Sequence, residues 1–194
     1  MPKIIVSGLT AAGKTTHARL IAKALSIPYF SGSGLLSQLA GVPGPWSPEL
    51  DQLRSAGSLD TELDRLMVAQ LRDSEHGVFD AWTLPWLVSE NCLKIWIESD
   101  FPSRVLKAMV SELRKGRHPV ADEVSRMVRQ KDDFSRAMFE RLYSFDLYVD
   151  HEVFDTGLDC SQYITRPTIE DSDAGIQRFD AIVMAALKSA IPSE

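Results

Sequence analysis

The sequence has few of the residues that mark secreted, membrane-bound or nucleic-acid-binding proteins. It holds two cysteines, Cys92 and Cys160, which lie far apart and lack metal-ligand spacing, so we expect free thiols and a cytoplasmic protein. Acidic residues outnumber basic ones by 27 to 21, and a net charge of −6 argues against a broad basic face for duplex nucleic acid. No apolar run approaches the ~20 residues that cross a bilayer. We therefore expect neither a nucleic acid nor a membrane as partner.

Other absences narrow the class further. The four histidines, His17, His76, His118 and His151, are scattered without the spacing of a metal site. There is no internal repeat or low-complexity tract, and residues 1–3 run straight into an apolar stretch with no signal peptide. A chain of 194 residues with 44% hydrophobic side chains has room for one sizeable core. We expect a single domain over residues 1–194.

The most informative stretch is residues 8–15, GLTAAGKT, which follow the apolar run at 4–6. They match the pattern G-x-x-x-x-G-K-[ST] between a predicted strand and a predicted helix. Glycines let the backbone wrap around phosphate oxygens, and the amides that open the helix supply donors and partial positive charge. A chance match is expected in only about one sequence in a hundred of this length. The stretch predicts a phosphate-binding loop.

The chemistry of this loop predicts its ligand. Lys14 would bridge terminal phosphates as a point charge, and the Thr15 hydroxyl would ligate Mg²⁺, so we expect a metal-bound nucleoside triphosphate. The predicted nucleotide-binding residues are Gly8, Ala11, Ala12, Gly13, Lys14, Thr15 and Thr16.

Strand and helix patterns alternate along the chain, which favours a doubly wound parallel sheet. We expect strands at 4–6, 27–30, 78–80, 93–97 and from 153 toward 160, with helices at 14–25, from 31 onward, at 59–75 with Asp60 as a cap, around 105–113, and at 176–187. Residues 41–48 predict a stiff loop around Trp46. Asp80 ends an apolar strand, at the edge of the sheet where ligands bind, and is placed to hold Mg²⁺ through water. The alternative for Asp80 is a turn former.

Residues 114–141 are helical and rich in both charges. Phosphoryl transfer needs positive charge and exclusion of water, which a basic lid supplies on closing. The alternative is a solvated helix pair held by internal ion pairs, and for any single basic residue this second interpretation is favoured. For the segment as a whole, the phosphate-binding loop favours the lid.

The chain resembles the cytidylate kinases, especially their short archaeal type. The likeness is carried by the phosphate loop, by residues 30–40, 60–65, 78–80, 93–97 and 142–146, and by Lys131-Asp132. It implies an α/β P-loop NTPase of three layers, α/β/α, with a five-stranded parallel sheet and a helical lid at about 114–141. It also implies transfer of the ATP γ-phosphoryl group, with Mg²⁺, to a small acceptor held by a helical region at about 31–76. The implied catalytic residues are Lys14, Asp80, Arg129, Lys131 and Arg136, with Arg104 and Lys107 as weaker candidates, in a monomer or homodimer.

The chain departs from the family pattern on the acceptor side. Ser37 stands where an arginine normally meets the acceptor phosphate, and Gly34 replaces an aspartate. Leu66-Met67 stands for Arg-Gln, Ala81-Trp82 for Gly-Arg, and Lys131 for an arginine. Each lost arginine removes a charge-assisted bond worth about 1.5 to 3 kcal/mol, unless Arg54 or Arg65 compensates.

These departures suggest an acceptor site rebuilt for a less anionic, more apolar alcohol, such as a nucleoside or a specialised metabolite. The predicted lining is Ser37, Arg65, Met67, Trp82 and Trp86, with Trp46 as a cover over a ring; the alternative for the tryptophans is core packing. A true nucleoside monophosphate kinase for CMP or dCMP remains an alternative, because Arg65 and the lid arginines could hold a phosphate. A catalytically inactive nucleotide-binding regulatory protein is the alternative from another class.

Overall fold

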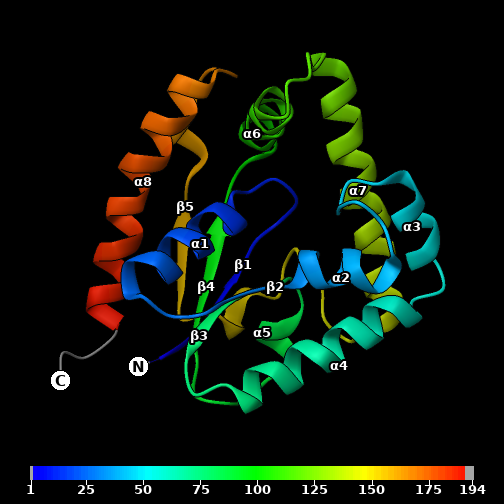
Figure 1. Ribbon diagram of the computed structural model, residues 1–194, viewed down its shortest axis with the longest axis vertical. Helices are drawn as coiled ribbons and strands as arrows, with labels where there is room; N and C mark the ends of the chain where they lie inside the picture. Colours follow the sequence, from blue (N-terminus) through cyan, green and yellow to red (C-terminus); the bar gives the residue numbers. More distant parts are fainter. Residues whose placement is uncertain (1, 191–194) are drawn as a thin grey trace.

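A five-stranded parallel sheet forms the centre of the molecule (Figure 1), as the sequence predicted. The computed structural model describes residues 2–190. The strand order is β2-β3-β1-β4-β5, and every neighbouring pair is parallel. The strands are β1 Lys3–Ser7, β2 Tyr29–Ser31, β3 Gly77–Asp80, β4 Leu93–Glu98 and β5 Thr156–Asp159.

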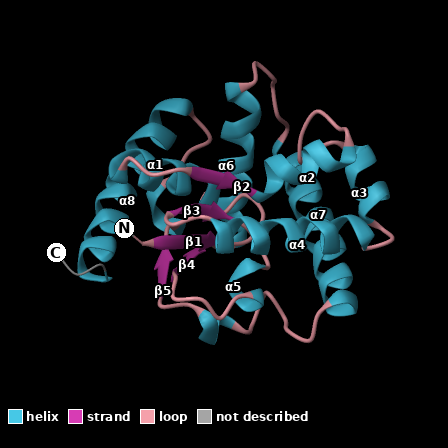
Figure 2. Ribbon diagram, turned by 60° about the horizontal axis from the view of Figure 1, so that its bottom comes forward, coloured by secondary structure: helices cyan, strands magenta, loops and turns pink. Residues whose placement is uncertain are grey.

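Helices cover both faces of the sheet and extend to one side of it (Figures 1 and 2). Because side chains alternate along a strand, Ile4 and Val6 of β1 pack against α1 and α8, whereas Ile5 packs against α4 and α5. This is the predicted three-layer α/β/α arrangement. The helices are α1 Lys14–Leu25, α2 Gly32–Ala40, α3 Pro48–Arg54, α4 Ser58–Asp73, α5 Leu84–Leu87, α6 Phe101–Arg114, α7 Ala121–Leu142 and α8 Ile169–Ala190.

Several local predictions need correction. The fifth strand begins at Thr156, after a short 3₁₀ turn at His151–Val153, and the sequence analysis missed the short helices α3 and α5. Asp60 does not cap α4: Gly57 precedes that helix, and the Asp60 carboxylate bonds to Arg54 instead. Residues 114–141 are not helical throughout: they comprise the last residue of α6, a connection, and most of the long helix α7. Both cysteines are free, and no helix within residues 2–190 has the length and apolar character that a membrane crossing requires.

Candidate active site

The phosphate-binding loop joins β1 to α1 and leaves the first amides of that helix free for a ligand. Gly13 precedes the helix with φ of 104°, no side chain caps the helix, and its first turn holds no acidic residue. Gly8 is required by close packing, because a Cβ there would lie 2.6 Å from the Ile97 carbonyl oxygen. The helix dipole and the uncapped amides therefore favour an anion at this point.

Two side chains from α6 donate hydrogen bonds to carbonyl oxygens of the phosphate-binding loop. Arg104 donates from Nη1 to the Thr10 carbonyl at 3.1 Å and to Asp132 of α7 at 2.6 Å. Lys107 donates to the Ala12 carbonyl at 3.3 Å and to the Ser99 hydroxyl at 2.8 Å. The structure thus brings both weaker candidates to the phosphate loop, where they contact its carbonyl oxygens.

Thr15, Asp80 and Tyr29 form a cluster of oxygen ligands beside the loop. The Thr15 hydroxyl and the Tyr29 hydroxyl both donate to Asp80 Oδ2, at 2.6 and 2.9 Å. Asp80 is buried at the end of β3, opposite Val6 of β1. Burial, together with the Asp80 charge, raises the pKa of Tyr29. A carboxylate and a hydroxyl are ligand types that Mg²⁺ prefers, so the cluster fits the predicted metal site. Tyr29 was missed as a site residue, although its position on the strand beside β3 was a usable signal.

Lys14, at the end of the phosphate-binding loop, is partly buried. Burial lowers the pKa of its ammonium group, and the nearby Asp80 carboxylate opposes that shift. The ammonium nitrogen lies 5.3 Å from the centre of the Trp82 ring. The Lys14 ammonium group therefore lies near two groups that attract a cation, the Trp82 ring and the Asp80 carboxylate.

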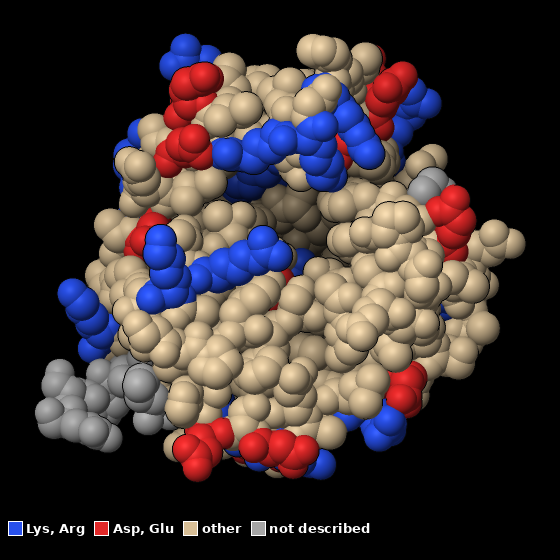
Figure 3. All heavy atoms as spheres, viewed as in Figure 1, with Lys and Arg blue, Asp and Glu red and all other residues tan. Residues whose placement is uncertain are grey.

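A cavity of about 490 Å³ extends from the phosphate loop into the space bounded by α2, α3, α4 and α7. Figure 3 shows a hollow whose upper and left rims carry Lys and Arg side chains. The apolar part of the lining includes Trp46, Leu50, Met67, Trp82 and Phe139. We call this space the acceptor cavity.

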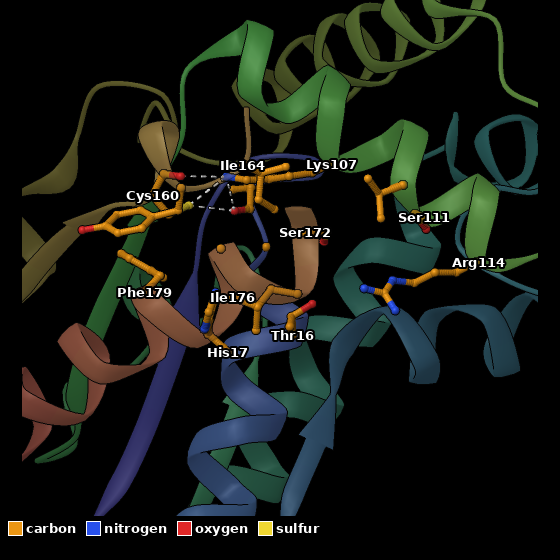
Figure 4. Close-up of a pocket in the computed structure, with 15 residues that line it drawn as sticks. Thr16, His17, Lys107, Ser111, Arg114, Cys160, Ile164, Ser172, Ile176 and Phe179 are labelled. Carbon is orange, nitrogen blue, oxygen red and sulfur yellow. Dashed lines mark hydrogen bonds between the residues drawn. The ribbon is translucent and has the colours of Figure 1, made fainter. Parts of the chain in front are cut away.

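A smaller cavity of about 170 Å³ lies on the other side of the loop, between α1, α6 and α8. Gly13, Thr16 and Lys107 line it toward the loop, and Phe179 lines it from α8. Figure 4 shows Lys107 reaching Cys160 across this cavity, with 2.9 Å between Nζ and Sγ. We call this space the donor cavity. The two cavities place a ligand site on each side of Gly13.

Of the five predicted acceptor residues, Met67 and Trp82 line the acceptor cavity and three do not. Ser37 donates to the Ser33 carbonyl of its own helix at 2.9 Å. Arg65 is exposed and pairs with Glu62 at 2.7 Å, because a residue two positions from Met67 lies on another face of the helix. Trp86 stacks on Phe145 and donates to the Asp150 carbonyl at 2.8 Å. Core packing, the alternative weighed for the tryptophans, accounts for Trp86.

The same helical periodicity separates the predicted lid residues of α7. Lys131 lines the acceptor cavity and donates to the Pro45 carbonyl at 2.6 Å. Arg129 lies over the Phe101 ring at 4.6 Å, and exposed Arg136 pairs with Asp146 at 2.7 Å. Neither arginine lines the acceptor cavity, so their part in catalysis stays a prediction that requires movement of α7.

Arg54 and Asp60 form a buried ion pair in the wall of the acceptor cavity. Arg54 Nη2 lies 2.8 Å from Asp60 Oδ1, and Nε lies 3.1 Å from Oδ2. Both residues are about 3% exposed and the guanidinium also lies 5.5 Å from the Phe134 ring centre. The sequence predicted Arg54 only as a substitute for a lost arginine, and no local pattern links it to Asp60, because the two residues lie on different helices, α3 and α4.

The comparisons with known proteins agree with this geometry. No model of a protein family matches the chain. A cytidylate kinase of Desulfurococcus amylolyticus is 31% identical over 157 residues, which cover 80% of this chain and 82% of the relative. The chain belongs to the cytidylate kinase family. The cytidylate kinase of Pyrobaculum islandicum is 29% identical, over 83% of this chain and 85% of the relative.

Solved structures with the same fold are more distant in sequence. A shikimate kinase of Bacteroides thetaiotaomicron has a TM-score of 0.55 at 11% identity, covering 94% of this chain and 98% of its own. An uncharacterised protein of Eubacterium ventriosum has a TM-score of 0.64 at 14% identity, covering 97% and 99%. These confirm the predicted P-loop fold. This cytidylate kinase family member is an ATP-dependent kinase, and its Thr15–Asp80 pair suits the Mg²⁺ that such kinases use.

Asp64 gives the acceptor cavity of this cytidylate kinase family member a titratable group. Its carboxylate accepts hydrogen bonds from Thr83, at 2.5 Å, and from Tyr143. Burial raises the pKa of Asp64 to about 6, although the two hydroxyl bonds and Arg54 act against that shift. The ionised form of Asp64 is therefore costly in the folded protein.

Replacing Asp64 with asparagine should make stability less dependent on pH between about 4 and 6. The folded pKa of about 6 lies above the ordinary 3.8, so the unfolded chain ionises first as the pH rises. As the pH rises over that interval, the free energy of unfolding of the wild-type protein should therefore fall by up to about 3 kcal/mol relative to that of Asp64→Asn. Above about pH 6 the difference should stay constant. Urea unfolding at several pH values measures this. Parallel pH profiles for the two proteins would contradict the assignment.

Proposed function

We propose that this kinase transfers the γ-phosphoryl group of ATP to a neutral or weakly charged alcohol with an apolar ring or skeleton, such as a nucleoside or a specialised metabolite. The observation that carries the proposal is that the two cations which α3 and α7 contribute to the cavity wall, Arg54 and Lys131, are both paired with other protein groups. Arg54 is bonded to Asp60, and Lys131 is bonded to Pro45 and lies 3.4 Å from Asp51. These two cations are therefore engaged before an acceptor binds, whereas the other cations that line the cavity, Lys14, Arg19 and Lys107, lie on α1 and α6.

The donor side keeps what ATP requires. The free amides of α1 and the Lys14 ammonium would hold the β- and γ-phosphates, with the base in the donor cavity. Thr15 and Asp80 would hold Mg²⁺, which supplies charge neutralisation for the transferred group. Lys14, which lines the acceptor cavity next to Gly13, would stabilise charge on the γ-phosphoryl oxygens as the group moves.

The acceptor side would bind mainly through apolar contact. Trp46, Met67, Trp82 and Phe139 present carbon surface, and burial of such surface contributes about 25 cal/mol per Å². A phosphate monoester that took Arg54 as its partner would have to break the Arg54–Asp60 pair, and the freed Asp60 would then remain as an unpaired buried charge. A neutral alcohol leaves that pair intact.

A nucleoside monophosphate kinase for CMP or dCMP is the second candidate. Its support is the family itself, whose relatives are named cytidylate kinase, together with the cations that line the cavity, among them Arg19, Arg54 and Lys131. This candidate requires Arg54 and Lys131 to exchange their carboxylate partners for the acceptor phosphate. An inactive regulatory protein is not favoured, because the chain belongs to a kinase family and keeps Lys14, Thr15 and Asp80 in place.

A panel of acceptors separates the two candidates. ADP release would be measured with cytidine, deoxycytidine, uridine and adenosine beside CMP, dCMP, UMP and AMP, with the Lys14→Met variant as blank. We expect nucleosides, or neutral alcohols of similar size, to give higher kcat/KM than their monophosphates by at least about 10-fold, since one charge-assisted bond is worth about 1.5 kcal/mol or more. Efficient turnover of CMP at micromolar concentration, with cytidine inert, would establish the second candidate instead.

A further inference from the structure

Lys14 of the phosphate loop and Trp82 of the acceptor cavity face each other. The Lys14 ammonium lies 5.3 Å from the Trp82 ring centre, within the range of a cation–π contact. Trp82 therefore touches the side chain that serves the donor side, although its ring lines the acceptor cavity.

The ring that faces Lys14 is itself held in place. Trp82 follows Asp80 by two residues at the end of β3, and its carbonyl accepts a hydrogen bond of 2.9 Å from the Ser7 hydroxyl of β1. Its ring meets Phe139 of α7 edge-on, with 5.6 Å between centres and 73° between planes. Phe139 is buried at 4% exposure. The sheet edge and the long helix together fix the ring.

We propose that Trp82 is a positioning residue for Lys14, holding its ammonium group at the γ-phosphate before ATP arrives. A lysine side chain has four flexible carbons and loses considerable rotamer freedom when it is fixed. An aromatic face that is already fixed supplies part of this ordering and attracts the cation without forming a salt bridge that phosphate would have to break. Asp80 is shared with Thr15 and Tyr29, so it cannot fix Lys14 alone.

Two other roles for Trp82 make different predictions. If the ring serves only as a platform for the acceptor, its loss changes acceptor binding and leaves the donor side untouched. If the ring instead draws Lys14 away from phosphate, its loss makes ATP bind more tightly or turn over faster. The positioning role requires a slower step at the γ-phosphate even with no acceptor present.

The test is therefore Mg–ATP hydrolysis, in which water is the acceptor and ADP and inorganic phosphate are the products. This choice makes the test independent of the acceptor class proposed above. Trp82→Leu should lower kcat of hydrolysis by about 5- to 30-fold, the range of a desolvated cation–π contact, and change the KM for ATP by less than about threefold. Trp82→Phe should recover most of the loss, because phenylalanine keeps an aromatic face. In a Lys14→Met background, Trp82→Leu should have no further effect.

A direct spectroscopic measurement accompanies the kinetics. The ε-methylene protons of Lys14, assigned by their absence in Lys14→Met, should lie upfield in the wild type because of the ring current, and should shift downfield in Trp82→Leu. The control is Trp86→Leu, which removes an indole outside the acceptor cavity and should leave hydrolysis unchanged. Melting temperatures of all variants exclude loss of fold.

Unchanged hydrolysis in folded Trp82→Leu overturns the proposal, as does faster hydrolysis. An equal loss in the Lys14→Met background also overturns it, since the ring would then act independently of Lys14. An unshifted Lys14 resonance in Trp82→Leu would show that the two groups are not in contact.

Discussion

Replacing Lys14 with methionine should lower kcat for phosphoryl transfer by about 10³-fold or more while the protein stays folded. The lysine is the loop's only side-chain cation at the point where phosphate would bind, between free helix amides and the Thr15–Asp80 pair. Methionine keeps much of the side chain's volume, so the change removes the charge, with its cation–π contact to Trp82, and little else. Burial already disfavours the charged form of Lys14, as its lowered pKa indicates, so stability should not fall.

ADP release in a coupled assay with ATP and Mg²⁺ measures this effect, and isothermal titration with ATP measures binding separately. The matched control is Lys23→Met, the same substitution on an exposed residue in the last turn of α1. Lys23→Met should keep wild-type kcat. If Lys14→Met retained more than about a tenth of the activity, the loop would not be stabilising the charge of a moving phosphoryl group.

The donor side could be predicted from the sequence because its parts are contiguous or follow strand ends. Gly8 to Thr15 form one uninterrupted motif, and the neighbouring strands β1 and β3 bring Asp80 beside it. The order of apolar strands and amphipathic helices was enough to predict the parallel sheet. The errors in the predicted sheet are shifts of a few residues at strand ends, such as the start of β5 at Thr156.

The acceptor side could be predicted only in part, because helices from distant parts of the chain form it. Arg65 and Met67 are two residues apart, about 200° around the helix, so only one of them faces the cavity, and the family resemblance did not contain that information. The Arg54–Asp60 pair joins a short helix to the next one through a Gly57 turn, and no periodic pattern marks it. Trp82 and Trp86 look alike in sequence, yet only Trp82 reaches the cavity.

Replacing Arg54 alone with methionine should destabilise the protein by about 3 to 5 kcal/mol. The substitution leaves Asp60, about 3% exposed, without its three hydrogen bonds from the guanidinium. A buried carboxylate without a partner must either stay charged at high cost or take up a proton. Urea unfolding at neutral pH measures the loss. Arg65→Met, which breaks an exposed pair with Glu62, should leave the urea midpoint close to that of the wild type.

The double variant Arg54→Met, Asp60→Leu connects this stability argument to substrate choice. Removing both charges should recover most of the stability lost in Arg54→Met, because apolar residues of similar volume often replace a buried ion pair without loss. If Arg54 serves Asp60 and not an acceptor phosphate, the double variant should keep its kcat/KM for a neutral alcohol within about threefold. A nucleoside monophosphate kinase that holds its acceptor phosphate with Arg54 would lose at least about 10-fold. A different result would be a double variant that recovers stability and yet loses most of its kcat/KM for a phosphorylated acceptor. That result would mean that Arg54 leaves Asp60 during turnover. In that case the buried ion pair would hold Arg54 in reserve until a phosphorylated acceptor binds.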